Sequence, residues 1–208
     1  MNEALLEKLA GSLTAEDTAL VPFLPYLLQD LWELGASPQT VVDLIGRHVK
    51  APETQHFLDL ACGKGAVSVA IAKAFGAPVA GIDIVPEFIE FATYKAKEHR
   101  VASLCTFIVA DANTVVRNSA YYDIVIFCAA GNILGEPEET LKLLGSTVRE
   151  NGFVIIDEGY LEDGHAEVRY QNYAYLTRQQ WLECFGRAGL RLLEEVVSLP
   201  ETCAAANG

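Results

Sequence analysis

The sequence predicts an α/β protein built on a doubly wound, mostly parallel sheet. From residue 56 onward, short apolar segments of strand length alternate with longer segments that carry apolar residues at helical spacing. Strand candidates such as Ile124-Val-Ile-Phe-Cys128 are apolar throughout, as expected for strands covered on both faces. Ligands of such sheets bind beyond the carboxyl ends of the strands, where Gly63, Asp83, Asp111 and Cys128 fall in this chain.

The predicted elements follow one another in a regular order. The pattern indicates strand 56–60, helix 65–75, strand 78–83, helix 86–99, strand 104–110, strand 121–128, helix 137–149 and strand 152–159. The segment from Thr177 to Gly189 is typical of a capped helix that ends at a glycine. Leu190 to Leu199 then predicts one more strand.

Residues 1–50 are expected to form an N-terminal helical cap, and residues 51–208 the main unit, within one structural domain. Ser37 and Pro38 predict a helix start, with serine as the cap and proline at the first helical position. The segment Leu20–Leu34 is apolar on most sides, so we expect a helix that is largely covered. Prolines and polar residues interrupt it, and it is too short to span a bilayer, which predicts no membrane association.

Composition narrows the class of protein. The 208 residues are 51% hydrophobic, enough for one core, and the N-terminus lacks a signal peptide, so we expect a cytoplasmic protein. A net charge of −13 without a Lys/Arg cluster argues against a nucleic-acid partner and fits a neutral or cationic small-molecule substrate. The five cysteines and four histidines show no metal-ligand spacing, so we predict reduced thiols and no metal.

The most informative motif is Phe57-Leu-Asp-Leu-Ala-Cys-Gly-Lys-Gly65, which predicts a strand, a glycine turn and the start of a helix. Such a turn lets backbone approach a nucleotide, and the helix N-terminus offers unpaired N–H groups. Asp83, about twenty residues after the turn, can accept both ribose hydroxyls. A nicotinamide fold would have a third glycine where Ser68 stands, and a P-loop would have Gly-Lys-Ser/Thr, so both are disfavoured.

The pattern Asp59-x-x-Cys-Gly63-x-Gly65 closely resembles the first motif of class I S-adenosylmethionine-dependent methyltransferases, which have a Rossmann-like sheet. Ala61 stands where that family usually has its first glycine. The resemblance extends over roughly residues 55–199 and implies S-adenosyl-L-methionine as cofactor and S-adenosyl-L-homocysteine as product. It also implies an N-terminal lid over the cofactor, from which Tyr26 and Trp32 are candidates to contact ligand.

The resemblance assigns roles to several residues. Gly63 and Gly65 would lie near the methionine and ribose, Asp83 would bind the ribose hydroxyls, and Asp111 the adenine amino group. Asp59 would orient the turn or reach the cofactor's ammonium. Each acid has a structural alternative, as a helix cap or a turn residue. The expected cofactor-binding residues are Asp59, Ala61, Gly63, Gly65, Asp83, Ile84, Asp111, Ala112 and Cys128.

The acceptor side carries weaker signals. Glu158, Tyr160 and His165 are candidates for a base or an orienting group, although His165 also fits a solvated loop. Tyr170, Tyr173 and Tyr175 fit either a substrate pocket or ordinary packing. Asn132 lacks the Pro-Pro that follows it in enzymes that methylate amino nitrogens of bases or glutamine, which disfavours that chemistry.

The sequence-based expectation is therefore methyl transfer to a small molecule. Its alternatives are a non-catalytic S-adenosylmethionine-binding module and a methyltransferase that acts on a protein. In the family the sheet normally ends with an inserted antiparallel strand, but only nine residues follow Leu199, ending in the turn-forming Asn207-Gly208. We expect that strand to be missing through truncation, which would leave a sheet edge open to homodimer formation.

Overall fold

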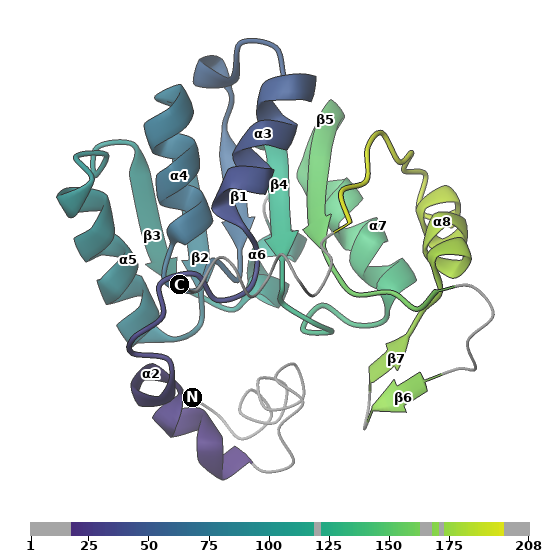
Figure 1. The fold of residues 1–208 in the computed structure, drawn as a ribbon. Helices are drawn as coiled ribbons and strands as arrows, with labels where there is room; N and C mark the ends of the chain where they lie inside the picture. The colour runs from purple at the N-terminus through teal and green to yellow at the C-terminus, as the bar shows by residue number, and fades with distance from the viewer. Residues whose placement is uncertain (1–17, 119–121, 163–167, 171–172, 198–208) are drawn as a thin grey trace.

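The computed structural model describes residues 18–118, 122–162, 168–170 and 173–197. Its centre is a sheet of five parallel strands in the order β3-β2-β1-β4-β5 (Figure 1). The strands are β1 (Phe57–Leu60), β2 (Val79–Asp83), β3 (Cys105–Val109), β4 (Tyr122–Cys128) and β5 (Val148–Asp157). The doubly wound parallel sheet expected from the sequence is confirmed, and the strand order reverses at β1.

Helices cover both faces of this sheet (Figure 1). One face carries α3 (Pro38–His48), α4 (Ala66–Phe75) and α5 (Pro86–Glu98). The other carries α6 (Ala112–Asn118) and α7 (Pro137–Thr147). Beyond the sheet, α8 (Arg178–Arg187) packs on α7 through Leu141, Trp181 and Cys184. The predicted serine cap of α3 and the capping box of Thr177 on α8 are both present.

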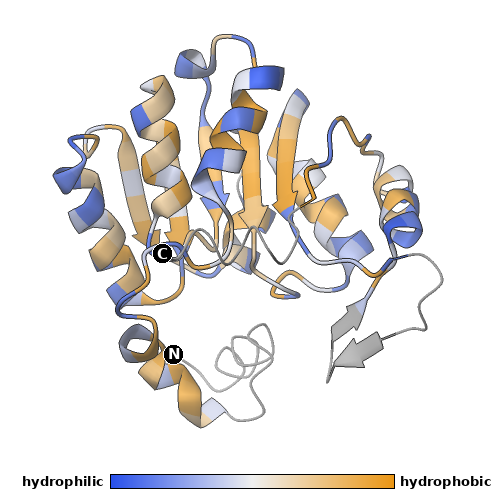
Figure 2. Ribbon diagram, viewed as in Figure 1, coloured by the Kyte–Doolittle hydropathy of each residue, from blue (hydrophilic) through white to orange (hydrophobic). Residues whose placement is uncertain are grey.

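The two cores explain why the central strands are apolar without alternation. Along β1 and β4, Phe57, Ile124 and Ile126 pack under α3, α4 and α5, while Leu58 and Val125 pack under α6 and α7. All five side chains are fully buried. Figure 2 shows the same concentration of hydrophobic residues in the strands. Because both faces are covered, only the strand ends can present polar groups to a ligand.

The prediction of one covered helix over Leu20–Leu34 is wrong. The chain instead forms the short 3₁₀ helix η1 (Thr18–Phe23) and the single turn α2 (Leu24–Leu27), followed by turns. Pro22 and Pro25 are the physical reason, since proline in a helix interior removes a hydrogen bond and clashes with the preceding turn. Tyr26 is 69% exposed rather than covered.

Other predicted elements differ from the structure in four places. The fifth strand begins four residues earlier than expected, at Val148, and α6 was not anticipated. The hairpin of β6 (Val168–Tyr170) and β7 (Tyr173–Tyr175) was also missed. Leu190 to Val197 is not a strand, because no backbone ladder holds it to β5 in the described residues. The rest of that predicted strand and the chain end lie outside the described residues.

Side chains rather than backbone pairing fix the Leu190–Val197 segment. Glu194 accepts hydrogen bonds from Arg47 at 2.8 Å and lies 2.6 Å from His48, both on α3. Glu195 accepts from Arg178 at the start of α8, at 2.8 Å. These contacts lower the pKa of both glutamates, first through the hydrogen bonds from their arginines.

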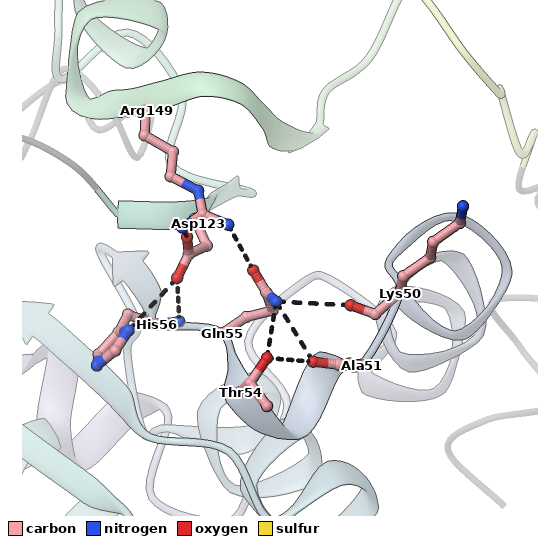
Figure 3. A network of polar contacts seen from close by, with 7 residues as sticks. All are labelled: Lys50, Ala51, Thr54, Gln55, His56, Asp123 and Arg149. Atoms are coloured by element: carbon pink, nitrogen blue, oxygen red, sulfur yellow. Dashed lines mark hydrogen bonds and ion pairs between the residues drawn. The ribbon is translucent and has the colours of Figure 1, made fainter.

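A polar network joins the amino ends of β1, β4 and β5 (Figure 3). The buried carboxylate of Asp123 accepts a hydrogen bond from the His56 backbone N–H at 2.6 Å. The guanidinium of Arg149 on β5 forms an ion pair with the same carboxylate. Arg149 also donates to Gln55, whose amide donates to the carbonyl of Ala51. The network therefore ties the amino ends of β1, β4 and β5 together, at the place where the β4–β5 register shifts.

We expect Asp123→Ala to lower the free energy of unfolding by about 2 kcal/mol, because it removes the acceptor of the half-buried His56 N–H and the counter-ion of Arg149, which then retains Gln55. Chemical denaturation of the variant checks this. Arg149→Ala should cost less, since that side chain is 52% exposed. Wild-type stability of Asp123→Ala contradicts this account of the network.

Candidate cofactor site

A cavity of about 190 Å³ opens at the carboxyl ends of β1, β2 and β4, where the strand order reverses. Its floor is the turn that follows β1, and its walls come from the ends of β2 and β4 and from the loop after β3. Residues 24–35, which we call the lid segment, form the remaining wall. The site thus lies where a doubly wound sheet places its ligands.

The floor of the cavity is an unusual piece of backbone. Ala61, Gly63 and Gly65 all have positive φ, of 56°, 52° and 74°. For alanine this region costs roughly 1–2 kcal/mol, so the structure explains why the family usually has glycine at that position. The turn is closed by a hydrogen bond from the Gly65 N–H to the Cys62 carbonyl, at 2.9 Å.

Gly65 does not line the cavity, although the resemblance gives it a ligand-facing role. A Cβ at Gly65 would lie 2.7 Å from the Cβ of Ala92 and 2.9 Å from the Phe107 ring. The residue is therefore needed for close packing of the turn against α5 and β3. Its approach to a ligand stays a prediction. Ala61 and Gly63 do line the cavity.

Asp83 lies at the end of β2 and faces the cavity. Its carboxylate accepts hydrogen bonds from the backbone N–H of Gly63 at 2.8 Å and of Val85 at 2.9 Å. Burial raises the pKa of Asp83, and these backbone hydrogen bonds oppose the rise. Each oxygen still has acceptor capacity, so one carboxylate can fix the turn, start α5 and take hydroxyl groups from a ligand.

Asp59 lies beneath the turn and is almost fully buried. The Ser68 hydroxyl donates a 2.5 Å hydrogen bond to its carboxylate, which links β1 to the first turn of α4. The pKa of Asp59 is raised to about 7, mainly by burial and also by the nearby Asp83 charge, while hydrogen bonds from Ser68 oppose the rise. Asp59 also lines the cavity, so the turn-orienting and ligand-facing alternatives both remain open.

Asp111 precedes α6 and lines the cavity. The family resemblance assigns this carboxylate to the adenine amino group. Its Oδ1 accepts from the backbone N–H of Asn113 at 2.9 Å and from the Asn113 side-chain amide at 3.1 Å. The helix-cap alternative is therefore present in the structure. Both of these bonds use one oxygen, so the cap does not preclude a contact with a ligand.

The other expected residues form the apolar walls. Ile84, Ala112 and Cys128 line the cavity, together with Cys62 and Ile133. Burial raises the pKa of the Cys62 and Cys128 thiols well above its usual value, which disfavours thiolate chemistry there. The cavity combines apolar walls, carboxylates and a glycine turn that a ligand can approach closely. This combination suits a ligand with a flat base, a ribose and an ammonium group. The carboxylate acceptors and apolar walls of the cavity therefore fit S-adenosylmethionine.

Sequence reasoning missed most of the lid contribution. Trp32 lines the cavity as expected, but Tyr26 does not, and Leu24, Leu28 and Leu34 line it instead. A Cβ at Gly63 would lie 3.1 Å from Leu34, which shows how closely the lid segment approaches the turn. The sequence shows that this segment is apolar. Because its prolines prevent a regular helix, helical spacing does not predict which of its side chains face the cavity.

The acceptor candidates lie around a second cavity, also of about 190 Å³. Glu158, Tyr160 and Cys128 line it, and Cys128 therefore belongs to both cavities. A hydrogen bond to Glu195 raises the pKa of Tyr160 and occupies its hydroxyl. Asp157, which ends β5 opposite Cys128, lines the second cavity and was missed. The rule that found Asp83, an acid at a strand's carboxyl end, would have found it too.

Several sequence candidates have other surroundings or fall outside the described residues. His165 is among the residues that the structure does not describe, as are the side chains of Tyr170 and Tyr173. The Tyr175 ring lies near Gly159. His99 stacks on Trp32 with ring centroids 5.0 Å apart. The absence of a metal stays a prediction, although the described residues hold no group of three or more suitable ligands.

Within the described part of the chain, the thiols of Cys62, Cys105, Cys128 and Cys184 are free. No helix in that part combines the length and apolar character needed to cross a bilayer.

The parallel sheet, the glycine turn and the acid ending β2 together define the fold of class I S-adenosylmethionine-dependent methyltransferases. A family model described as "Methyltransferase domain" matches residues 53–189, and the chain belongs to that family.

Known relatives agree with this class. A ribosomal protein L11 methyltransferase of Cupriavidus metallidurans is 28% identical over 150 residues, which are 71% of this chain and 45% of the relative. The chain thus spans less than half the length of that curated relative. A methyltransferase of Geobacter sulfurreducens, solved with S-adenosyl-L-homocysteine, matches with a TM-score of 0.65 and 26% identity, covering 76% of this chain and 66% of that one. A Thiobacillus denitrificans methyltransferase matches with a TM-score of 0.63 at 22% identity, covering 76% and 67%.

We expect Asp83→Ala to weaken S-adenosylhomocysteine binding about 100-fold, because charge-assisted hydrogen bonds to two hydroxyls contribute about 3 kcal/mol together. Isothermal titration calorimetry measures the loss. Asp43→Asn, an exposed acid on α3, is the matched control, and thermal melts establish that both variants fold. A folded Asp83→Ala protein with wild-type affinity refutes the ribose assignment.

Asp59 gives a pH-dependent expectation. Its pKa is about 7 in the native state against a usual 3.8, so the folded protein holds this proton more tightly than the unfolded chain. The charge on Asp59 therefore costs stability increasingly as pH rises from about 4 to about 7. Asp59→Asn removes that charge and should gain about 3 kcal/mol over wild type at pH 8, and little at pH 4. Denaturant titrations at both pH values measure the difference, and an advantage that does not grow with pH contradicts the assignment.

Proposed function

We propose that this chain binds S-adenosylmethionine in the cavity at the β1–β4 crevice and transfers its methyl group to a small-molecule acceptor. The observation that carries the proposal is the convergence of Asp59, Asp83 and Asp111 on one cavity over a glycine turn. These acids come from three different strand ends. A structural role alone would not require all three to face the same hollow.

The cofactor, when bound, supplies a methyl group already activated by the sulfonium. The work of the protein is then to hold and enclose the reactants, and positioning of this kind contributes on the order of 7–11 kcal/mol in ideal cases. Asp83 offers a carboxylate to the ribose, and Asp111 offers one to the base. The lid segment covers one side of the cavity with apolar side chains, which would limit the access of water to the reactants.

We assign the second cavity to the methyl acceptor, which would approach the cofactor past Cys128. Its lining is mostly apolar, and its acidic members are Asp157, Glu158, Glu194 and Glu195, of which Glu195 is paired with Arg178 in the same lining. An acidic rim in a chain of net charge −13 repels anionic acceptors and favours neutral or cationic ones. An amine or a hydroxyl group on an apolar skeleton would suit both features.

Asp157 is the group that we assign to proton removal from the acceptor. It lines the second cavity and is paired across the sheet with Cys128, which lines both cavities. Burial raises the pKa of Asp157, which brings this carboxylate closer to the range of an effective base.

A protein acceptor is the second candidate function. It is favoured by the relative from Cupriavidus metallidurans, whose name places its activity on a ribosomal protein. In that case a side chain of the partner would enter the second cavity. A binding module without catalysis is the remaining alternative, because fold alone does not determine function.

Release of S-adenosylhomocysteine from S-adenosylmethionine tests these readings. The protein is assayed with a panel of small amines, alcohols and thiols, and separately with ribosomal protein L11. Turnover with a panel compound and none with L11 supports the proposal, and the reverse result establishes the protein acceptor. Cofactor binding without turnover on any acceptor favours the binding module.

Once the assay has identified an acceptor, Asp157→Asn should lower kcat for that acceptor about 100-fold or more. The affinity for S-adenosylhomocysteine should be unchanged. Asp43→Asn, an exposed acid on α3 that lines neither cavity, is the matched control for charge removal, and Glu158→Gln tests the neighbouring candidate. An unchanged kcat in Asp157→Asn excludes this carboxylate as the base.

A further inference from the structure

Lys64 occupies the centre of the glycine turn, yet its ammonium is bound by the lid segment. It donates hydrogen bonds to the carbonyls of Leu28 at 2.5 Å, Gln29 at 3.2 Å and Leu31 at 2.6 Å. An ammonium has three N–H donors and no acceptor, so these three carbonyls use its whole capacity.

The surroundings of Lys64 make these bonds matter. The residue is only 4% exposed, and its ammonium lies 4.7 Å from the centre of the Phe91 ring on α5. Burial lowers the pKa of Lys64, while the charge of Asp30 in the lid segment raises it. A buried cation without hydrogen-bond partners is costly, so the ammonium is stable where it is only while the lid segment stays in place.

The lid segment is also bound to the backbone of the same residue. The indole N–H of Trp32 donates to the Lys64 carbonyl at 3.1 Å. The Trp32 ring stacks on His99, and the Lys95 ammonium lies 4.6 Å from its centre. One residue of the turn therefore holds the segment at two points, through its side chain and through its carbonyl.

These contacts bear on the cofactor because the same segment encloses the cavity. Leu28 and Trp32, which contact Lys64, also line the cavity. Close packing continues at Gly35, where a Cβ would lie 2.3 Å from the Cβ of Ala129 in the loop after β4. The lid segment therefore bridges the two sides of the crevice and forms part of the cavity wall, so its opening would widen the way out for a ligand.

We propose that Lys64 is a positioning residue that holds the lid segment closed over the cofactor cavity and so sets how long the cofactor stays bound. Lys64 acts through Leu28, Trp32 and their neighbours rather than through the reacting atoms. The part of this inference that concerns ligand residence rests on the proposed cofactor. The part that concerns lid closure does not.

Hydrogen exchange of the ligand-free protein tests lid closure directly. In Lys64→Met the stem is kept and the three carbonyls lose their donor. The amides of Leu28, Gln29 and Leu31, which are hydrogen-bonded within the segment, should exchange at least 10-fold faster than in wild type. Lys73→Met, the same change at an exposed site on α4, should leave them unchanged. Equal protection of these amides in Lys64→Met and wild type overturns the proposal.

Ligand dissociation tests the consequence. The dissociation rate of S-adenosylhomocysteine, measured by stopped-flow fluorescence in a Trp181→Phe background that leaves Trp32 as the reporter, should rise at least 10-fold in Lys64→Met. Lys64→Arg, which keeps the charge but not the compact geometry, should restore part of the difference. Faster amide exchange with an unchanged dissociation rate refutes the residence role. If wild type binds no S-adenosylhomocysteine, the cofactor proposal fails while the exchange experiment still decides lid closure.

Trp32→Phe provides the second variant if Lys64→Met does not fold. It removes only the indole hydrogen bond to the Lys64 carbonyl and keeps an aromatic ring to stack on His99. Exchange in the lid segment should again accelerate, by less than in Lys64→Met. Unchanged exchange in a folded Trp32→Phe protein contradicts the proposal.

Discussion

The turn that follows β1 is the constraint on which the rest of the site depends. Its backbone runs through the left-handed region at Ala61, Gly63 and Gly65, which leaves the Gly63 N–H directed at Asp83. The side chain of Lys64 then reaches the lid segment, and the absence of a side chain at Gly65 lets α5 and β3 pack closely. The strain at Ala61, roughly 1–2 kcal/mol, is offset by the contacts that this geometry permits.

The electrostatics of the site follow from the same turn. Asp59 and Asp83 lie on either side of it, both buried, and burial raises the pKa of each. Backbone N–H groups of Gly63, Ile84 and Val85 stabilise the charge on Asp83, whereas Ser68 alone does so for Asp59, through its hydroxyl and its backbone N–H. The two carboxyls are therefore not equivalent, although both belong to the same motif. Asp83 is the better placed to remain ionised and accept hydrogen bonds from a neutral ribose.

Much of the fold could be predicted from the sequence because local and global signals agree there. Each local pattern is compatible with a single backbone conformation. This holds for the continuous apolar strands, the glycine turn and the serine cap of α3. The lid segment could not be predicted in this way. Its apolar residues suggested a buried helix, while Pro22 and Pro25 prevent one, and the contacts that settle its path come from Lys64, forty residues away in the motif.

The acceptor side was harder still, for a related reason. Asp157 and Glu158 are adjacent in the chain, and only the register of β5 against β4 shows that Asp157 stands opposite Cys128. The Leu190–Val197 segment has the composition of a strand, but strand formation needs a partner edge, and here charged side chains hold the segment instead. Sequence patterns specify which residues can pair and leave open which of them do.

The pairing of β1 with β4 has a consequence for how the protein reaches its native state. β1, β2 and β3 follow one another closely, but β4 must return to β1 from far along the chain, and the His56–Asp123 contact at this seam joins residues 67 positions apart. Closing so long a loop carries a larger entropic cost than the local pairings, so the first three strands can assemble early and the crevice late. A ligand that contacts both β1 and β4 therefore stabilises the complete sheet. It does not stabilise a partly folded chain in which β4 is not yet paired with β1.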